Sequence, residues 1–185
     1  MKSVSHIFGG EAKVKIMRLF IFNPSLIFTP TEVSNRAKER PDTARKELRI
    51  LTKAGLIKQR AKGYTLDPSC PYLPAIENFL IDATPMTGKE IIRKISRAGN
   101  IKLILTSGVF LHNRDARVDM LVVGDNLKQA KLLSVMSSIE AELGKELRYA
   151  AFETIDFQYR FSIYDKLILD ILEAQHEKIL NKLAI

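Results

Sequence analysis

The chain has little cysteine and no long apolar run. Its single cysteine, Cys70, cannot form a disulfide within the chain, and no histidine or second cysteine lies close enough in sequence to complete a metal site. We therefore expect Cys70 to be a packing residue. No stretch approaches the roughly 18 to 20 apolar residues that cross a bilayer, and residues 1–13 lack the apolar region and cleavage site of a signal peptide. These absences predict a cytoplasmic protein with no membrane partner.

The usual signatures of catalysis are also missing. The sequence has no phosphate loop of the G-x-x-x-x-G-K type and no nucleophile elbow. Its three histidines, His6, His112 and His176, are not spaced as metal ligands, and we expect surface or packing roles for them. We predict no metal site and no cofactor.

What the sequence does have is an uneven distribution of charge. With 46% hydrophobic and 27% charged residues, the 185-residue chain has the composition of an ordinary globular protein, and its length suits two small domains. Residues 1–70 contain 14 Lys+Arg and 6 Asp+Glu, whereas residues 71–185 contain 15 of each, so the whole net charge of +8 lies in the first part. This asymmetry predicts a polyanionic partner for the first part, although a solubilising surface gives the same balance.

The basic part begins with two expected helices. Residues 11–22 have apolar side chains at helical spacing and are followed by Asn23-Pro24, which ends the helix. A second helix starts with the spacing of a capping box, in which Thr29 is the N-cap, Pro30 takes the first helical position and Glu32 reaches back. It is expected to end near Pro41.

A third helix is expected over residues 42–54, with two contrasting faces. At about 100° per residue, Ala44, Leu48 and Leu51 fall on one stripe, which predicts the buried face. Basic residues occupy the opposite face. A helix-turn-helix needs this division, because one face docks on the other helices while the other enters the major groove. Ile50 also points outward, either toward a thymine methyl group or a protein, or as an isolated exposed aliphatic.

A small hairpin is expected directly after this helix. Gly55 is placed to end the helix in the left-handed conformation, and residues 56–66 then read as strand, turn and strand. Lys58, Arg60 and Lys62 lie on or beside the expected tip, where they can reach phosphates or a minor groove.

The phrase ARKELRILTKAGLI, followed at once by a short hairpin with Gly63-Tyr64, resembles the winged-helix transcriptional regulators of the ArsR and MarR groups. The resemblance covers roughly residues 8–68 and implies a DNA-binding domain over residues 1–68. Some winged helices with this pattern bind protein instead. The candidate DNA-binding residues are Thr43, Arg45, Lys46, Arg49, Lys53, Lys58, Arg60 and Lys62.

Residues 69–185 predict a second domain that joins the first through the proline-rich junction 69–74. Apolar spacing indicates helices, and β-branched runs indicate strands. The expected order is helix 75–83, helix 88–98, strand 101–110, strand 117–123, helix 126–144, strand 147–152, helix 154–161 and helix 164–183. This order predicts an α+β fold, in which helices cover a small sheet.

The run ILTSGVFLHNRDARVDMLVVGD, with the helix and strand after it, resembles the small nucleotidyltransferase domain of the DNA polymerase beta superfamily. Such a domain is appended to winged helices in some prokaryotic regulators. In active members a Gly-Ser holds nucleotide phosphates, two aspartates on the next strand bind divalent metal, and a later strand adds a third carboxylate. Phosphoryl transfer needs these carboxylates because they hold the metal ions that neutralise developing charge.

The resemblance implies a vestigial nucleotide site at Ser107, Gly108, Arg117 and Asp119. Thr106-Ser107 stands at the Gly-Ser position, Arg117 stands at the first aspartate, and strand 147–152 has no acid. One carboxylate beside an arginine is a poor magnesium site, so we expect a domain that is not an enzyme.

Three further expectations concern this vestigial site. Asp119 is expected to pair with Arg117 or Arg114. Ser107 and Gly108 can still hold a phosphate through their backbone N–H groups. His112 lies in the turn that would overhang the site.

These patterns favour sequence-specific binding of double-stranded DNA by a transcriptional regulator. Because a single winged helix reads few base pairs, a homodimer on a palindromic site is the expected arrangement. The second domain would then serve dimerisation, sensing, or docking of a nucleotide or protein partner. The alternatives are an active minimal nucleotidyltransferase that uses the winged helix to choose its substrate, and an adaptor that binds protein or RNA.

Overall fold

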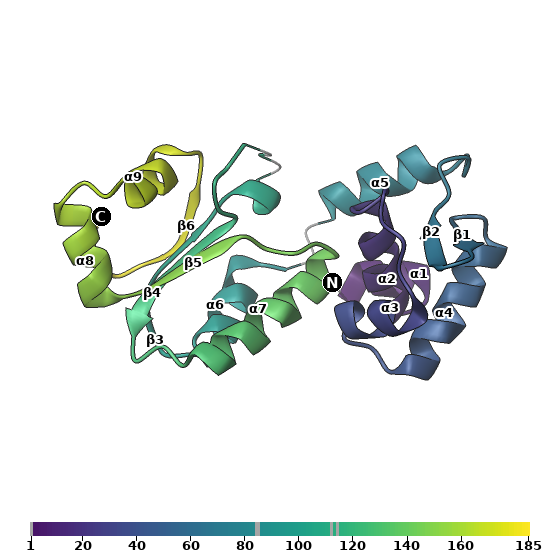
Figure 1. Cartoon of the computed structure of the whole chain (residues 1–185), viewed down its shortest axis with the longest axis horizontal. Coiled ribbons are helices and arrows are strands. Elements are labelled where there is room, and N and C mark those ends of the chain that lie inside the picture. Colours follow the sequence, from purple (N-terminus) through teal and green to yellow (C-terminus); the bar gives the residue numbers. More distant parts are fainter. Residues whose placement is uncertain (1, 84–85, 112, 114) are drawn as a thin grey trace. The chain divides into compact units, whose positions relative to one another are not determined.

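The computed structural model describes residues 2–83, 86–111, 113 and 115–185. The chain divides into two compact units, which are described separately (Figure 1). The first unit comprises residues 1–86 with 137–146, and the second comprises residues 87–136 with 147–185. Helices and strands are both well represented, so the predicted α+β class is confirmed. The described part of the chain holds no helix that is both long and apolar enough to cross a membrane.

The first unit contains a three-helix core and a hairpin. Its elements are α1 (Lys2–Phe8), α2 (Glu11–Ile21), α3 (Pro30–Ala37), α4 (Pro41–Lys53), β1 (Ile57–Arg60), β2 (Gly63–Leu66) and α5 (Leu73–Asp82), with residues 137–146 from the second half of α7 (Gln129–Leu143) and beyond. Helix α2 is central, with Val14, Ile16 and Phe20 fully buried. The ring of Phe20 packs edge-on against Phe28 with centroids 5.5 Å apart.

Helix α3 begins as the sequence predicts. Thr29 Oγ1 accepts a hydrogen bond from Glu32 N at 3.3 Å, and Thr29 N donates to Glu32 Oε2 at 2.7 Å. This reciprocal pair is the expected capping box, and Pro30 takes the first helical position.

The first unit extends beyond the expected boundary at residue 68. Leu80 of α5 is fully buried in the core of this unit, together with Cys70, which is only 7% exposed. The predicted packing role of Cys70 is therefore confirmed. Apolar burial explains the difference in the boundary, because Leu80 and its neighbours cannot be covered unless α5 packs on the first core. The segment 69–74, expected as a junction, leads into α5 within the same unit.

The second unit is a four-stranded sheet with helices on its two faces (Figure 1). Its elements are α6 (Gly88–Ile95), β3 (Asn100–Thr106), the short 3-10 turn η1 (Gly108–Phe110), β4 (Met120–Asp125), the first half of α7, β5 (Tyr149–Glu153), α8 (Thr154–Ser162), α9 (Lys166–Glu173) and β6 (Glu177–Asn181). The strand order is β5-β4-β3-β6, with β4 and β5 parallel and the other pairs antiparallel. Helix α7 is the crossover that the parallel pair requires.

Alternate residues of the central strands form two cores. Leu103 and Leu105 of β3 and Leu121 of β4 share one cluster with Phe157 of α8 and Ile168 of α9. Their neighbours in sequence, such as Ile104 and Val122, are fully buried as well. Because side chains alternate along a strand, both faces of the sheet must be covered.

Several element boundaries differ from the sequence-based expectation, and the two largest differences lie in the second unit. The strand expected over 101–110 ends at Thr106, because Gly108 takes a left-handed φ of 50° that turns the chain into η1. The helix expected over 164–183 ends at Glu173, and β6 follows as an edge strand paired with β3. That pairing satisfies backbone groups along the β3 edge, a non-local effect that the helical spacing around Ile168 did not reveal.

Candidate nucleic-acid interface

A three-residue turn joins α3 to α4 and is held in place from several sides. Lys38 adopts the left-handed conformation with φ 52°, and Ser34 Oγ donates to the Glu39 carbonyl at 2.8 Å. Lys15 Nζ on α2 reaches Glu39 Oε1 at 3.0 Å. Burial works to lower the pKa of Lys15, but the hydrogen bond to Glu39 and nearby carboxylates raise it above its usual value, so Lys15 stays charged. The turn therefore fixes the direction of α4.

Helix α4 has the dimensions and the two faces of a recognition helix. Its 13 residues span about 20 Å, and a helix of about 10 to 12 Å diameter fits a major groove about 12 Å wide. Ala44, Leu48 and Leu51 are buried, which confirms the predicted inner stripe. Glu47 is buried too, with Oε2 3.7 Å from Lys13 Nζ on α2. Sequence reasoning missed this contact, because the register of α4 on α2 is not a local property.

The outer face of α4 carries unpaired positive charge. Lys46, Arg49 and Lys53 are exposed, and within the described residues none of them has an ion-pair partner. Ile50 lies among them and is 38% exposed. Of the other candidates on this helix, Thr43 is half-buried in the first turn, and Arg45 lies 3.5 Å from Asp42 in an exposed pair.

Arg40, the N-cap residue of α4, is one basic residue that sequence reasoning left out. Its side chain is exposed, and it has no ion-pair partner in the part of the chain that the structure describes. The Arg40-Pro41 step in the sequence could have indicated this residue. Proline at the first helical position places the preceding side chain beside the N-terminus of the helix.

The hairpin follows directly after the C-terminal end of α4. Gly55 N donates to Thr52 O and Leu56 N donates to Leu51 O, both at 3.0 Å, and Gly55 has φ 75°. These two bonds form a Schellman motif, which turns the chain into β1. The predicted helix end at Gly55 and the predicted hairpin are therefore confirmed.

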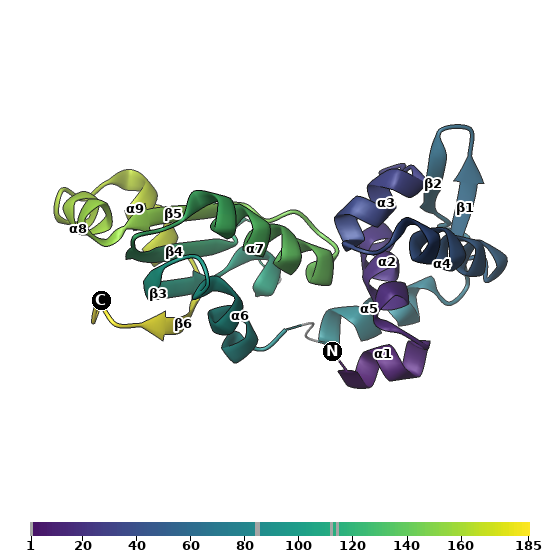
Figure 2. The ribbon, with the colours of Figure 1, turned by 90° about the horizontal axis from the view of Figure 1, so that it is seen from below.

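A third short strand segment anchors the hairpin. Phe28 forms an isolated antiparallel bridge with Tyr64, with N–O distances of 2.9 and 2.8 Å. Gly63 lies against this segment with φ 147°, and a Cβ there would lie 2.4 Å from the Phe28 carbonyl oxygen. Only glycine fits such an approach. Figure 2 shows the hairpin projecting past α3 and α4.

The hairpin tip carries two of its three basic residues without partners. Arg60 and Lys62 are exposed, and neither has an ion pair within the described residues. Lys58 differs, because its Nζ lies 3.2 Å from Asp67 Oδ1. Hydrogen bonds from Ser69 and then from Lys58 lower the pKa of Asp67 to about 2, so the pair is ionised at neutral pH.

The basic residues on these two adjacent elements form what we name the α4–wing surface. Its members are Arg40, Lys46, Arg49, Lys53, Arg60 and Lys62. Unpaired guanidinium and ammonium groups keep their full capacity to bind an anion, and those on an extended surface match a chain of phosphates better than a single small anion.

The residues of the expected nucleotide site in the second unit are engaged in internal contacts. Asp119 is 3% exposed, and its carboxylate accepts hydrogen bonds from Val109 N at 2.9 Å and Arg148 N at 2.8 Å. The Arg148 side chain lies 3.4 Å from the same carboxylate. The expected pairing of Asp119 with Arg117 is therefore wrong, and Arg114 lies outside the described residues.

The other three residues of this site are also used within the unit. Ser107 Oγ donates to the Gln175 carbonyl at 2.6 Å, and Arg117 forms an ion pair with Asp170. Gly108 packs so closely on Asp119 that a Cβ there would lie 2.0 Å from Oδ1. The backbone near Gly108 and Arg148 therefore packs closely around the Asp119 carboxylate.

The strand expected over 147–152, which lacks an acid, is β5 in the structure and extends one residue further, to Glu153. β5 runs to Glu153, whose carboxylate accepts hydrogen bonds from Asn126 N at 3.0 Å and Leu127 N at 2.8 Å. Asp119 precedes β4, whereas Glu153 ends β5, and the two strands are parallel. At about 3.3 Å per residue the two acids lie roughly 15 Å apart, too far to share a metal ion.

No group of three or more histidine, cysteine, aspartate or glutamate side chains is placed to hold a metal within the ranges that the structure describes. His112, expected in the overhanging turn, lies outside those ranges.

Comparison of the chain with protein-family models, with curated proteins and with solved structures gave no match.

Proposed function

We propose that this protein binds double-stranded DNA in a sequence-specific manner and acts as a transcriptional regulator in the cytosol. The observation that carries the proposal is the α4–wing surface, in which unpaired basic side chains line one face of a groove-sized helix and the tip of the adjacent hairpin. The helix would enter the major groove, with Lys46, Arg49 and Thr43 near the bases and the remaining cations on phosphates.

The charge distribution supports DNA rather than a protein as the partner. A protein-docking face normally has an apolar centre, whereas the outer face of α4 offers one partly exposed aliphatic residue, Ile50, among cations. A phosphate backbone matches that composition. The resemblance to ArsR- and MarR-type winged helices supports the same partner.

In this proposal the second unit is an inactive nucleotidyltransferase-like domain. The buried contacts of Asp119 and the separation of Glu153 support the loss of activity, because neither carboxylate is presented to a shared metal ion. The unit would instead serve dimerisation, sensing or docking, and a homodimer on a palindromic site would double the base pairs read.

Selection of bound duplexes from a random DNA pool tests the proposal. We expect the full chain to enrich a palindrome whose half-sites lie about one helical turn apart, roughly 10 base pairs centre to centre, or a multiple of it. Lys46→Ala/Arg49→Ala should abolish the enrichment. Arg97→Ala/Lys131→Ala removes the same charge from exposed positions of the second unit and should leave it intact. No enriched sequence with the wild type, or equal enrichment with Lys46→Ala/Arg49→Ala, would refute it.

A further inference from the structure

Helix α8 has apolar side chains on two opposite faces. Phe157 is buried against the sheet and stacks on Phe161, with ring centroids 6.2 Å apart. On the other side Ile155, Tyr159 and Ile163 are 81%, 63% and 53% exposed. These three residues, which we name the α8 outer face, follow each other at intervals of four and fall within about 80° on the helix. Ile163 N donates to Tyr159 O at 3.2 Å, so the helical turn continues through the last of them.

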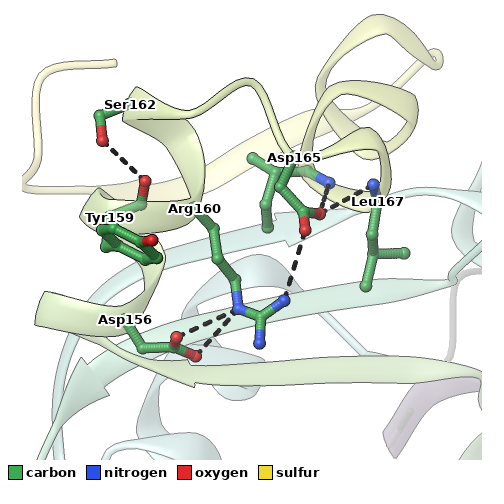
Figure 3. A network of polar contacts seen from close by, with 7 residues as sticks. Asp156, Tyr159, Arg160, Ser162, Asp165 and Leu167 are labelled. Carbon is green, nitrogen blue, oxygen red and sulfur yellow. Dashed lines mark hydrogen bonds and ion pairs between the residues drawn. The ribbon is translucent and has the colours of Figure 1, made fainter.

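A polar network between the two apolar faces links α8 to the start of α9. Arg160 Nε lies 3.1 and 3.2 Å from the two carboxylate oxygens of Asp156, and Arg160 Nη1 lies 3.4 Å from Asp165 Oδ2. Asp165 in turn caps α9 by accepting from Leu167 N at 2.9 Å. Figure 3 shows Arg160 reaching toward Asp165 while Tyr159 points away from this network. The helix that carries the α8 outer face is therefore connected to α9 by side-chain contacts.

A helix with a second apolar face exposed to solvent is unusual and indicates a partner. Tyr164, which is 77% exposed, follows the α8 outer face in sequence, whereas Phe161 lies on the opposite side of the helix with Phe157. With about 200 Å² for each large side chain, the exposed fractions of Ile155, Tyr159, Ile163 and Tyr164 give roughly 550 Å² per chain. A standard interface buries about 800 Å² per partner, so the backbone and flanking groups need to supply only a modest remainder.

Charge indicates which partner fits. The ionised groups beside the α8 outer face, Asp156, Arg160 and Asp165, are paired with each other. Because each of these groups has a partner of opposite sign, two copies can bring their α8 outer faces together without leaving unpaired ions of one sign in the contact.

We propose that the α8 outer face is the surface through which two copies of this chain associate. A twofold axis beside Tyr159 would pair the helices antiparallel, so that Ile155 packs against Ile163 of the partner subunit and the two tyrosines meet at the centre. Such an isologous contact is self-complementary and closes at two copies. The inference locates the dimer of the proposed function, but its test requires no DNA.

Sedimentation velocity of the full chain over a concentration series tests this interface. The wild type should form a dimer, and Tyr159→Glu should weaken it by about 30-fold or more, because the change places a charge at the centre of the apolar contact. Tyr72→Glu is the matched control, since Tyr72 is 69% exposed and lies in the first unit. It should leave the dimer constant unchanged.

A cysteine cross-link gives an independent readout should Tyr159→Glu fail to fold. Tyr159→Cys should form a disulfide between two chains under mild oxidation, whereas Tyr72→Cys and the wild type, whose Cys70 is buried, should not. A wild type that stays monomeric throughout the series would overturn the inference and leave the face to another protein. A dimer that survives Tyr159→Glu without a Tyr159→Cys cross-link would overturn it as well. Neither result would contradict the proposal that the chain binds double-stranded DNA.

Discussion

Gly63 brings the hairpin into contact with Phe28, and its replacement tests that contact. Gly63→Ala should destabilise the first unit by about 3 kcal/mol, because the new methyl group meets the Phe28 carbonyl at 2.4 Å while φ is 147°. Urea unfolding measures the loss. Gly55→Ala is the control, since Gly55 has φ 75° but nothing within 4 Å of its Cβ position, and should cost only about 1 kcal/mol. Equal costs would mean that the Phe28 contact contributes nothing.

The lowered pKa of Asp67 predicts a contribution to folding stability that depends on pH. Its pKa falls from the usual 3.8 to about 2 in the folded chain, first through the Ser69 hydrogen bonds and then through Lys58. Between these two values the unfolded chain binds more protons, so stability rises with pH there. The destabilisation caused by Asp67→Asn should be full above pH 4 and should shrink as the pH falls toward 2. Unfolding curves across this range check it, and a difference independent of pH would contradict it.

The role of Asp119 is expected to be structural. Asp119→Asn should cost about 2 to 3 kcal/mol, because one amide group of the new side chain must face a buried backbone N–H of Val109 or Arg148. Asp170→Asn breaks the more exposed pair with Arg117 and should cost less than about 1 kcal/mol. A magnesium-dependent rise of the wild-type melting temperature that Asp119→Asn removes would show instead that this carboxylate is open to metal.

Among the elements, α3 and α6 start with the same capping box, which allows a matched comparison. Thr29→Ala should remove about 1 kcal/mol from the first turn of α3 and speed its amide hydrogen exchange roughly fivefold, without changing α6. Thr87→Ala should do the reverse. Hydrogen exchange resolved by residue measures both. If either change accelerated both helices equally, the caps would not act locally.

Elements built by local rules could be predicted from the sequence, and those built by distant contacts could not. The Thr29 box, the buried stripe of α4 and the Gly55 turn all depend on residues within a few positions of each other. The Phe28–Tyr64 bridge and the pairing of β6 with β3 join residues far apart in the chain. Backbone pairing of this kind leaves no periodic trace in a short segment.

The same division separates the candidate site residues. Outward placement of Lys46 and Arg49 follows from the helical period alone, as the exposed side chains confirm. Lys58 was expected to reach phosphates or a minor groove, and in the structure its Nζ lies 3.2 Å from Asp67 Oδ1, at the far end of the hairpin sequence. Asp119 was expected to pair with an arginine nearby in sequence and instead contacts Arg148 across the sheet edge, a contact that requires the parallel β4–β5 register.

At the scale of the whole molecule, we propose that the excess charge gathered on one part of the chain serves a nucleic-acid partner. The net charge of +8 belongs to residues 1–70, and the unpaired cations of the α4–wing surface account for much of it. A solubilising surface would carry the same charge without ordered placement. Binding of DNA by the α4–wing surface depends on where the cations lie, whereas attraction of DNA to a solubilising surface depends only on total charge.

The salt dependence of duplex DNA binding, followed by fluorescence anisotropy, separates them most directly. The logarithm of the binding constant should fall linearly with the logarithm of the salt concentration, and Lys46→Ala/Arg49→Ala should make that slope shallower by about 2 while weakening binding. Arg97→Ala/Lys131→Ala, with the same loss of charge on the second unit, should leave slope and affinity unchanged. Equal effects from the two double variants, or no measurable binding by the wild type at low salt, would contradict the account.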